Sequence, residues 1–389
     1  MAMPNLPPLI MGGAGWSYQL THDPDADSVL DIVEAAFSQG VRAIDTSPYY
    51  EPSEELLGKA LSHPNILSQY RRKDFFIMTK CGRIAADHFD YSPDWIKKSL
   101  TRSLDRFGTM YLDVVFCHDV EFVTVEEAVA AVATLFELVD QGRIKFAGIS
   151  GYDLEAMIRV ADAVRERLGR PVDVVQNWAQ LSLQNTRLES YGFAALRKAG
   201  VRAVCNASPL ACGLLRSGGV PVGKLGDWHP APSGLRAAAR QASQWVAEQG
   251  DSLASVSLRF AISQAAQSTY DTFQVSTITG ISTKSDLQEN IAAAAQVLGL
   301  PVDIEDRISH SSLSGRTALN MARVEADRVL CDGVRSILED YIDYALSKPP
   351  SAKGSDLRAP IDSITEDSND VPSRLYHSGS GNTPAQGTR

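Results

Sequence analysis

The sequence lacks several features that define large classes of protein. No stretch approaches the roughly 18 consecutive apolar residues that a membrane-spanning helix requires, and residues 1–10 lack the charged and apolar regions of a secretory signal. Acidic residues outnumber basic ones, 47 to 37, which gives a formal net charge of −10. Because nucleic acids and anionic membrane surfaces bind to basic patches, and no basic stripe is visible, we expect neither as a partner.

Cysteine is also scarce, and its five positions form no C-x-x-C pair. The odd count, together with the position of several cysteines beside apolar runs, indicates reduced and buried thiols. Such thiols are typical of a cytoplasmic protein, so we expect that location and no metal site. The five residues are Cys81, Cys117, Cys205, Cys212 and Cys331.

What the sequence does contain is a regular alternation of short apolar runs and amphipathic segments. The chain has 389 residues and an apolar fraction of 44%, which is ordinary for a globular protein. The runs are apolar throughout, as in parallel strands that are covered on both faces. Strands are therefore expected at Leu9–Gly12, Val41–Thr46, Phe75–Lys80, Leu112–His118, Lys145–Ser150, Val172–Gln176, Val201–Ser208 and Gln274–Thr279.

Segments with helical periodicity follow these strands. Eight strand–helix units in about 300 residues predict an α/β protein with a closed (β/α)8 barrel, the TIM barrel. An open doubly wound sheet is the main alternative, but Gly12-Gly13-Ala14-Gly15 does not complete the G-x-G-x-x-G motif of that fold. The clear helical segments are Asp27–Ser38, Glu54–Leu61, Ser92–Phe107, Thr124–Asp140, Leu154–Leu168, Leu188–Lys198, Ser252–Ala265 and Lys284–Leu298.

Two regions interrupt the alternation. Leu214–Gly250 holds a polar, Gly- and Pro-bearing loop and a helix after the seventh strand, and long loops at that end of a barrel usually cover a site. Beyond the barrel, which we place at residues 1–300, we expect a C-terminal extension at 301–348 with one helix in Arg323–Ser347. Residues 349–389 are rich in Ser, Gly, Asp and Pro, which predicts a disordered tail.

Four polar residues follow consecutive barrel strands at the ends where the sites of such barrels lie. Asp45, Lys80 and His118 end strands two, three and four, and Tyr50 lies in the loop after strand two. Taken alone, each has an ordinary structural interpretation: a turn cap, a solvated lysine, a core histidine and a loop aromatic. Their occurrence at the same end of successive units favours a catalytic set.

Proton transfer by a phenol would explain this combination. A cationic Lys80 about 4 Å from Tyr50 would lower the tyrosine pKa by up to about three units from its usual value near 10. Asp45 would supply the counter-charge, and a neutral His118 would orient the reacting oxygen. This set suits hydride transfer at a carbonyl or carbinol carbon, in which a cofactor carries the hydride and the protein moves the proton.

The motifs around these residues resemble those of the aldo-keto reductases over about residues 5–298. They read AIDTSPYY, FIMTKCG, DVVFCHD, GRIKFAGIS, SPLACGLL and GISTKSDLQEN. The resemblance implies a TIM-barrel NAD(P)-dependent oxidoreductase in which Asp45, Tyr50, Lys80 and His118 are catalytic. It further implies a cofactor site, with Ser150 and Gln176 at the nicotinamide carboxamide, Ser208 and Leu210 at the pyrophosphate, and Gly280, Thr283 and Asn290 at the adenosine end.

Three positions depart from the family pattern. The family often has Asn after the carboxamide-binding serine, where this chain has Gly151, and a stacking aromatic where it has Ala207. Members that prefer NADPH commonly have Arg four residues before the adenine-contacting Asn, where this chain has Asp286. A carboxylate there would repel a 2′-phosphate, although Lys284 lies nearby, so the resemblance implies NAD rather than NADP.

Within the family, the motifs YLDVVFCHDVEF, NASPLACGLL and GDWHPAPSGLRAAA resemble those of members that oxidise aldoses such as D-arabinose and L-galactose. We therefore expect an NAD-dependent aldose 1-dehydrogenase that yields an aldonolactone, acting as a monomer or weak homodimer. Trp16, Trp178 and Trp228, with His229, are candidates for a wall that faces the sugar. The alternatives are an aldehyde or ketone reductase of fungal secondary metabolism and a non-catalytic regulatory subunit that binds the cofactor.

Overall fold

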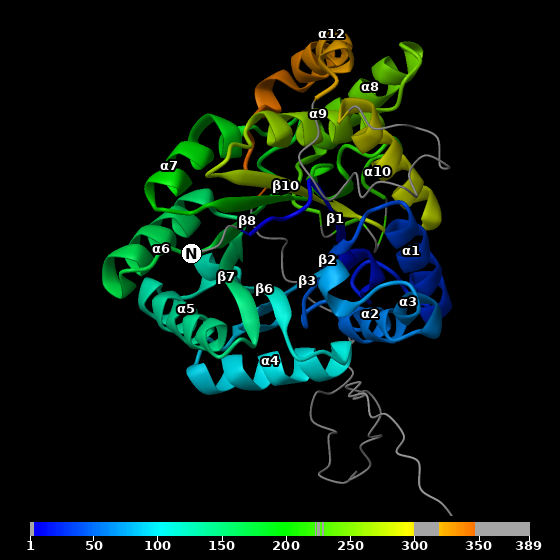
Figure 1. Ribbon diagram of the computed structural model, residues 1–389. Coiled ribbons are helices and arrows are strands. Elements are labelled where there is room, and N and C mark those ends of the chain that lie inside the picture. The colour runs from blue at the N-terminus through cyan, green and yellow to red at the C-terminus, as the bar shows by residue number, and fades with distance from the viewer. Residues whose placement is uncertain (1–3, 222, 224–225, 228, 299–318, 347–389) are drawn as a thin grey trace, which may run out of the picture. The chain divides into compact units, whose positions relative to one another are not determined.

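The computed structural model describes residues 4–298, except 222, 224–225 and 228, together with residues 319–346. Within these residues, eight parallel strands close into a barrel in the order β1-β10-β9-β8-β7-β6-β3-β2 (Figure 1). The predicted TIM barrel is therefore confirmed. Its strands are β1 (Leu9–Gly12), β2 (Ala43–Asp45), β3 (Phe76–Cys81), β6 (Leu112–His118), β7 (Ile144–Gly151), β8 (Val174–Trp178), β9 (Ala203–Ala207) and β10 (Gln274–Gly280).

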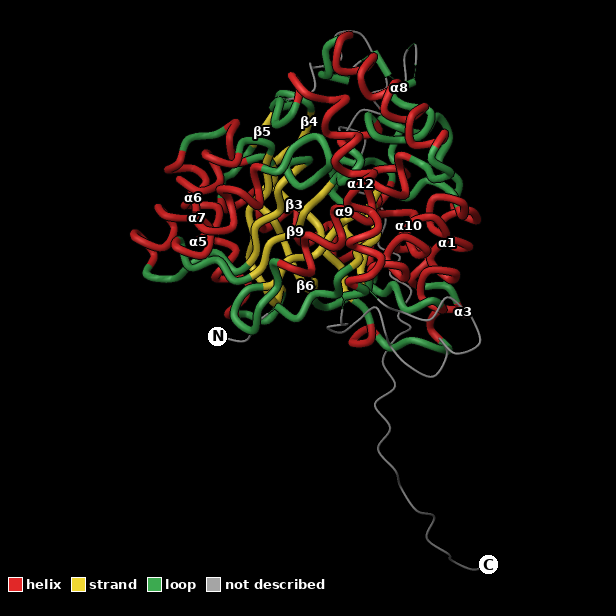
Figure 2. Tube along the Cα trace, turned by 90° about the horizontal axis from the view of Figure 1, so that it is seen from above, coloured by secondary structure: helices red, strands yellow, loops and turns green. Residues whose placement is uncertain are grey.

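The strands are buried on both faces, as their uninterrupted apolar composition predicts. All seven residues of β6 are buried, and the pattern is similar in β2, β9 and most of β3. Inside the barrel, Ile10, Met78, Phe116 and Val174 belong to one apolar cluster. A larger cluster fills the layer between the barrel and the helices that surround it (Figure 2).

Helices follow the strands, and local sequence signals set their ends. Ser92 caps the helix that begins at Pro93, and Thr124 and Glu127 form a capping box at the start of another. Gly108 ends the first of these helices with a positive φ of 58°. The helices are α1 (Ala26–Ser38), α2 (Ser53–Leu61), α3 (Pro64–Leu67), α4 (Pro93–Phe107), α5 (Val125–Asp140), α6 (Leu154–Leu168), α7 (Phe193–Lys198), α8 (Ser233–Glu248), α9 (Leu253–Gln267), α10 (Lys284–Val297) and α12 (Met321–Leu338).

Two local features differ from the sequence-based expectation. A short antiparallel hairpin, β4 (Arg83–Ala85) with β5 (His88–Phe89), follows β3 directly. The segment predicted as one helix over Leu188–Lys198 begins as a π-helix at Leu188–Gly192 before α7 continues it. Both differences are local and leave the order of the barrel strands unchanged.

The expected helix of the C-terminal extension is α12, which packs on α8 and α9. Val334, Leu338 and Cys331 of this helix are buried. The helix ends at Leu338, and a 3-10 turn follows. The predicted disordered tail and residues 299–318 lie outside the described residues.

In the part of the chain that the structure describes, none of the helices has the length and hydropathy needed to cross a lipid bilayer. All five cysteines are free thiols, and four of them are buried.

Candidate active site

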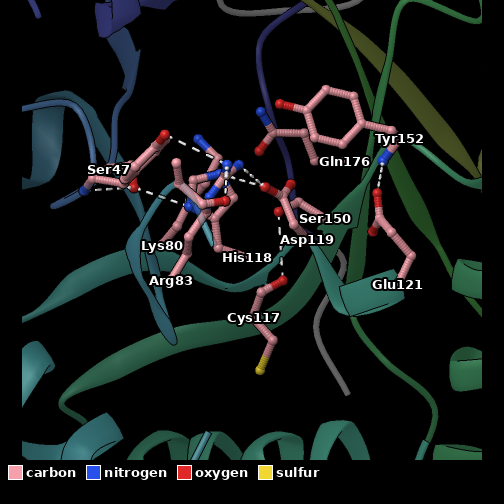
Figure 3. Close-up of polar contacts among 12 residues, drawn as sticks. Ser47, Lys80, Arg83, Cys117, His118, Asp119, Glu121, Ser150, Tyr152 and Gln176 are labelled. Atoms are coloured by element: carbon pink, nitrogen blue, oxygen red, sulfur yellow. Dashed lines mark hydrogen bonds and ion pairs between the residues drawn. The ribbon is translucent and has the colours of Figure 1, made fainter. Parts of the chain in front are cut away.

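The carboxyl ends of the barrel strands bring the candidate residues to one rim. His118 of β6 pairs in register with Ser150 of β7, and Ser150 pairs with Gln176 of β8. Lys80 lies near the end of β3, and Asp45 is the last residue of β2. Parallel strands therefore place all five side chains at the same end of the barrel. Figure 3 shows Lys80, His118, Ser150 and Gln176 together there.

Asp45 is the polar centre of this group. Its Oδ2 atom accepts hydrogen bonds from the Lys80 Nζ atom at 2.8 Å and from the Gln176 Nε2 atom at 3.1 Å. The Lys80 ammonium also donates to the Thr46 carbonyl at 3.0 Å. Burial raises the pKa of Asp45, whereas the Lys80 charge opposes that rise. A buried ion pair with these additional bonds holds both side chains in one geometry.

Tyr50 lies beside both Lys80 and His118. The Lys80 Nζ atom is 5.1 Å from the centre of the Tyr50 ring, and the Tyr50 and His118 ring centres are 5.8 Å apart. Burial, followed by the neighbouring Tyr152 and Asp45, raises the Tyr50 pKa well above 10. The expected lowering by Lys80 is therefore wrong for this structure, because the ammonium is neutralised by Asp45 and desolvation dominates.

His118 is neutral, and its environment indicates which ring nitrogen carries the proton. Burial and the nearby Lys80 and Arg83 charges lower its pKa well below 6.5. Its Nδ1 atom lies 3.1 Å from the Ser47 Oγ atom, which already accepts a hydrogen bond from the Tyr49 backbone N–H. The Ser47 hydroxyl is then best placed to donate to Nδ1, which leaves the proton on Nε2. His118 thus carries an N–H donor at Nε2.

Several charged and aromatic residues at this rim were not predicted from the sequence. Arg83 of β4 pairs with Asp119, whose Oδ2 atom is 3.7 Å from the His118 Nε2 atom. The Arg83 guanidinium lies over the Tyr49 ring and donates to the Tyr49 hydroxyl at 3.4 Å. Asp119 could have been predicted, because it directly follows His118 in the sequence. Arg83 could not, because it lies on the β4–β5 hairpin, whose short strands show no periodic pattern.

The predicted nicotinamide residues form a set whose hydrogen-bonding capacity fits a carboxamide. Because Gln176 Nε2 faces the Asp45 carboxylate, its Oε1 atom faces away, and this buried oxygen has no hydrogen-bond partner among the described residues. The Ser150 hydroxyl at the neighbouring strand end donates to the Cys117 carbonyl at 3.4 Å, a long bond that the carbonyl of a ligand could replace. An amide ligand with N–H donors and a carbonyl would therefore complete these bonds.

The remaining predicted cofactor residues lie on two segments after β9 and β10. Ser208 has a positive φ of 62°, and its Oγ atom accepts from the Cys212 N–H, while Leu210 precedes the 3-10 turn at Ala211–Gly213. Thr283 caps α10, and the Asn290 Nδ2 atom donates to the carbonyl of Gly280 at 3.3 Å. The amino end of α10 thus stands beside the end of β10, where a helix dipole favours anionic groups.

Asp286, which the sequence analysis predicts to favour NAD over NADP, also has a structural role. Its Oδ2 atom accepts from the backbone N–H groups of Ser282 and Thr283, which completes a capping box on α10. Its Oδ1 atom is 3.4 Å from the Arg216 guanidinium. The neighbouring Lys284 pairs with Asp31 at 2.6 Å.

The candidate sugar-facing residues differ in their surroundings. Trp178 ends β8 and packs edge-on against Tyr152, with ring centres 4.8 Å apart, so it belongs to the rim. Trp16 is buried in the turn after β1. His229 is buried, with both ring nitrogens bonded to the backbone of Ala211 and Ala231, which assigns it a loop-holding role. Trp228 lies outside the described residues.

Comparison with known proteins identifies the protein class. A model of the aldo/keto reductase family matches residues 8–299, which is most of the chain. The chain belongs to the aldo/keto reductase family. Membership of this family agrees with the observed barrel, which presents Asp45, Tyr50, Lys80 and His118 at one rim. It also shows that the chain is an NAD(P)-dependent oxidoreductase.

Individual relatives in this family are sugar dehydrogenases and carbonyl reductases. The D-arabinose 1-dehydrogenase of Saccharomyces cerevisiae is 41% identical over 259 residues, covering 66% of this chain and 75% of that protein. The L-galactose dehydrogenase of Arabidopsis thaliana is 32% identical over 282 residues, covering 72% and 82%. An NADH-specific methylglyoxal reductase of Escherichia coli is 29% identical over 223 residues, covering 53% and 62%.

Proposed function

We propose that this aldo/keto reductase is an NAD-dependent aldose 1-dehydrogenase, which oxidises the C1 hydroxyl of a sugar to the aldonolactone. The observation that carries the proposal is the position of Tyr50 and His118 side by side above the Asp45–Lys80 ion pair. The 41% identity to a D-arabinose 1-dehydrogenase supports the substrate class.

The chemistry is divided between the cofactor and the chain. The nicotinamide, when bound, accepts the hydride. The His118 Nε2–H orients the reacting oxygen, and Tyr50 accepts the proton that leaves the C1 hydroxyl. This step needs Tyr50 as the phenolate, and Lys80, held by Asp45 and Thr46 beside the Tyr50 ring, fixes the geometry in which the proton is transferred.

The carboxylate of Asp286 supports the choice of NAD over NADP. It lies at the amino end of α10, beside the predicted adenosine end of the cofactor, and a 2′-phosphate there would meet a like charge. We also propose a cytoplasmic location, since all five cysteines are free thiols.

Reduction of an aldehyde or ketone is a second candidate, because one observation favours it. Burial raises the Tyr50 pKa well above 10, so the resting side chain is a phenol that can donate a proton to a carbonyl oxygen. Oxidation needs the deprotonated phenolate of Tyr50, which is scarce at neutral pH, so the rate of oxidation is expected to rise with pH. Reduction needs the phenol and shows no such rise.

A cofactor-reduction screen tests the proposal. D-arabinose, L-galactose and L-fucose are incubated with NAD and, in parallel, with NADP, and formation of the reduced cofactor is followed by absorbance at pH 7 and pH 9. We expect turnover with NAD that increases with pH. Turnover of aldehydes with reduced cofactor, and of none of the three sugars, would instead support the reductase.

A further inference from the structure

Arg83 and Asp119 form a buried ion pair at the rim that the proton transfer described above does not use. Arg83 is the first residue of the β4–β5 hairpin, and Asp119 directly follows His118 at the end of β6. The Arg83 Nη1 atom binds the Asp119 Oδ2 atom, and each side chain is only 5% exposed. Figure 3 shows both side chains beside His118. Because removing two charges from water is costly, stability alone is a weak reason for such a pair.

The hairpin is built around the Arg83 guanidinium. The Nε atom donates to the Ala85 carbonyl at 3.3 Å, and the Nη2 atom donates to the Ala86 carbonyl at 3.0 Å, both within the hairpin itself. The guanidinium also lies 4.1 Å from the centre of the Tyr49 ring. These contacts fix the orientation of the group, so that its Nη1 atom meets Asp119.

The Asp119 oxygen that binds Arg83 also lies beside the donor of His118. Its Oδ2 atom is 3.7 Å from the His118 Nε2 atom, just beyond hydrogen-bonding distance. The bond between Ser47 and Nδ1 leaves the His118 proton on Nε2, so this N–H has a carboxylate as its near neighbour. A carboxylate accepts more strongly than the neutral oxygen of an alcohol or a carbonyl. If Oδ2 were released by Arg83, it would therefore compete with a substrate for the His118 donor.

The backbone of Asp119 shows that its position is held by its surroundings. The residue is left-handed, with φ of 61° and ψ of 61°, a conformation that costs energy for any residue other than glycine. Such residues persist where neighbouring contacts fix them, and they occur often at active sites. The bond to Arg83 is one such contact.

We propose that Arg83 is a positioning residue, which holds the Asp119 carboxylate and so keeps the His118 Nε2–H open for the reacting oxygen. The inference rests on the proposed function, in which His118 orients that oxygen. Arg83 moves no proton itself and acts only through Asp119. The β4–β5 hairpin, which delivers the guanidinium, is then a part of the active site.

The pair also affects the charge of His118. Burial, followed by the charges of Lys80 and Arg83, lowers the His118 pKa well below 6.5. If Arg83 were neutral, the Asp119 charge would act on the imidazole alone, and an opposite charge at this distance raises a pKa by about 1–3 units. The other titratable side chains that face the imidazole are Tyr49 and Tyr50.

A histidine titration followed by NMR tests the proposal without cofactor or turnover. The full-length protein is labelled at histidine, and the His118 signal is assigned by its loss in His118→Gln. We expect Arg83→Met to raise the His118 pKa by about one unit or more. Adding Asp119→Asn to Arg83→Met removes the competing carboxylate and should return the pKa to the wild-type value or below it. Arg167→Met, which removes an exposed arginine of α6 as a matched control, should leave the pKa unchanged.

Kinetics on the same variants test the consequence for the reaction. With D-arabinose and NAD as the probe, Arg83→Met should lower kcat by about 10–100-fold, because the substrate must first displace a charge-assisted hydrogen bond. The double variant should recover at least about tenfold of this loss. A purely structural role for the pair predicts the opposite, since a second substitution in the same buried cluster would damage the site further. Arg83→Lys, which keeps a cation beside Asp119, should retain the wild-type His118 pKa.

Arg83→Gln provides the same test should Arg83→Met not fold, because an amide can still bond the hairpin carbonyls. An unchanged His118 pKa in the variant that folds, or a double variant less active than the single one, overturns the inference. Wild-type oxidation of aldoses with NAD would in that case leave the proposed function standing. A wild type that oxidises no aldose, while the His118 pKa shifts as expected, would instead overturn the proposed function and support the arrangement at His118.

Discussion

At the scale of single residues, the pairing of the Lys80 charge with Asp45 affects the pKa of Tyr50. Lys80 would lower the Tyr50 pKa if its charge were free, but it donates to Asp45 at 2.8 Å. The ion pair therefore acts mainly as a rigid support at the base of the site. In the proposed mechanism Tyr50 itself transfers the proton, because the Lys80 ammonium lies 5.1 Å from the Tyr50 ring centre and is bonded to other groups.

Tyr50→Phe tests this assignment. The substitution removes the hydroxyl but keeps the ring that packs against His118, so general acid–base catalysis is lost while the shape of the site remains. We expect turnover to fall by about 10²–10⁴-fold and NAD affinity to change by less than about twofold. Steady-state kinetics and calorimetric titration of the same preparation measure the two quantities. Loss of cofactor binding in proportion to activity would contradict a proton-transfer role.

The site residues that sequence reasoning identified share one property, and those it missed share another. Asp45, Lys80 and His118 lie on buried strands, so their polarity contrasts with apolar neighbours and marks the end of the strand. Arg83 and Glu121 lie on a hairpin and a short turn, where charged residues are common and carry no such contrast. Only the three-dimensional fold shows that Arg83 contacts Asp119 and Tyr49 at the rim, and that Glu121 accepts from the backbone after β7.

At the scale of elements, the amino end of α10 combines a helix cap with the residue that we propose selects NAD over NADP. Asp286 caps the helix and faces Arg216, so its replacement affects both. Asp286→Arg should shift the ratio of kcat/KM for NAD and NADP by about tenfold toward NADP, because a guanidinium attracts the 2′-phosphate. Loss of the cap and repulsion from Arg216 should lower the free energy of unfolding by about 1 kcal/mol.

Asp286→Asn serves as the control, because an amide keeps most of the capping capacity without the added positive charge. Kinetics with both cofactors and urea denaturation of both variants separate the two effects. If Asp286→Arg loses stability but keeps the wild-type cofactor ratio, Asp286 is a helix cap alone.

The C-terminal helix α12 is attached to the barrel by a buried ionic network. The guanidinium of Arg259 in α9 bonds Asp327 of α12 through Nε at 2.7 Å and Nη2 at 2.9 Å, and Asp251 accepts from the same group. Arg323 also donates to Asp327 at 2.6 Å. The extension, predicted from sequence as a separate region, is thus joined by charge as well as by the apolar contacts of Val334 and Leu338.

Asp327→Ala should therefore destabilise the protein. Arg259 is almost fully buried and would keep only Asp251 as its carboxylate partner, so we expect a loss of about 2–3 kcal/mol, somewhat less than for breaking an isolated buried pair. Asp332→Ala, at an exposed position of the same helix, should change stability by less than about 0.5 kcal/mol. Thermal melting measures both, and hydrogen exchange should show the loss of protection in α9 and α12 first. Equal melting temperatures for the two variants would refute the role of Asp327.

The elements that could be predicted from the sequence are those with a strong period. Apolar runs such as Leu112–His118 coincide with the observed strand, because burial on both faces favours apolar residues at most positions. The β4–β5 hairpin has strands of three and two residues, which are too short to have a period, and the π-helix at Leu188–Gly192 has the composition of an ordinary helix. Tertiary contacts, not local sequence, determine both.

At the scale of the whole molecule, the barrel buries a set of ionisable side chains whose effects on stability oppose one another. Burial lowers the pKa of His118, so the folded state resists protonation and stability is lost as the pH falls below about 6.5. Burial raises the pKa of Glu121, so the folded state holds a proton that the unfolded chain releases near pH 4.5. Stability from Glu121 is therefore present below pH 4.5 and is lost as the pH rises toward 7.

Comparing the wild type with Glu121→Gln isolates the second effect, because His118 is common to both proteins and cancels in the difference. A shift from 4.5 to about 7 corresponds to roughly 3 kcal/mol at about 1.4 kcal/mol per pKa unit. The free energy of unfolding of Glu121→Gln, relative to the wild type, should thus increase by about 2–3 kcal/mol between pH 4.5 and pH 8. Urea denaturation at several pH values measures it, and a difference that stays constant would contradict the raised pKa.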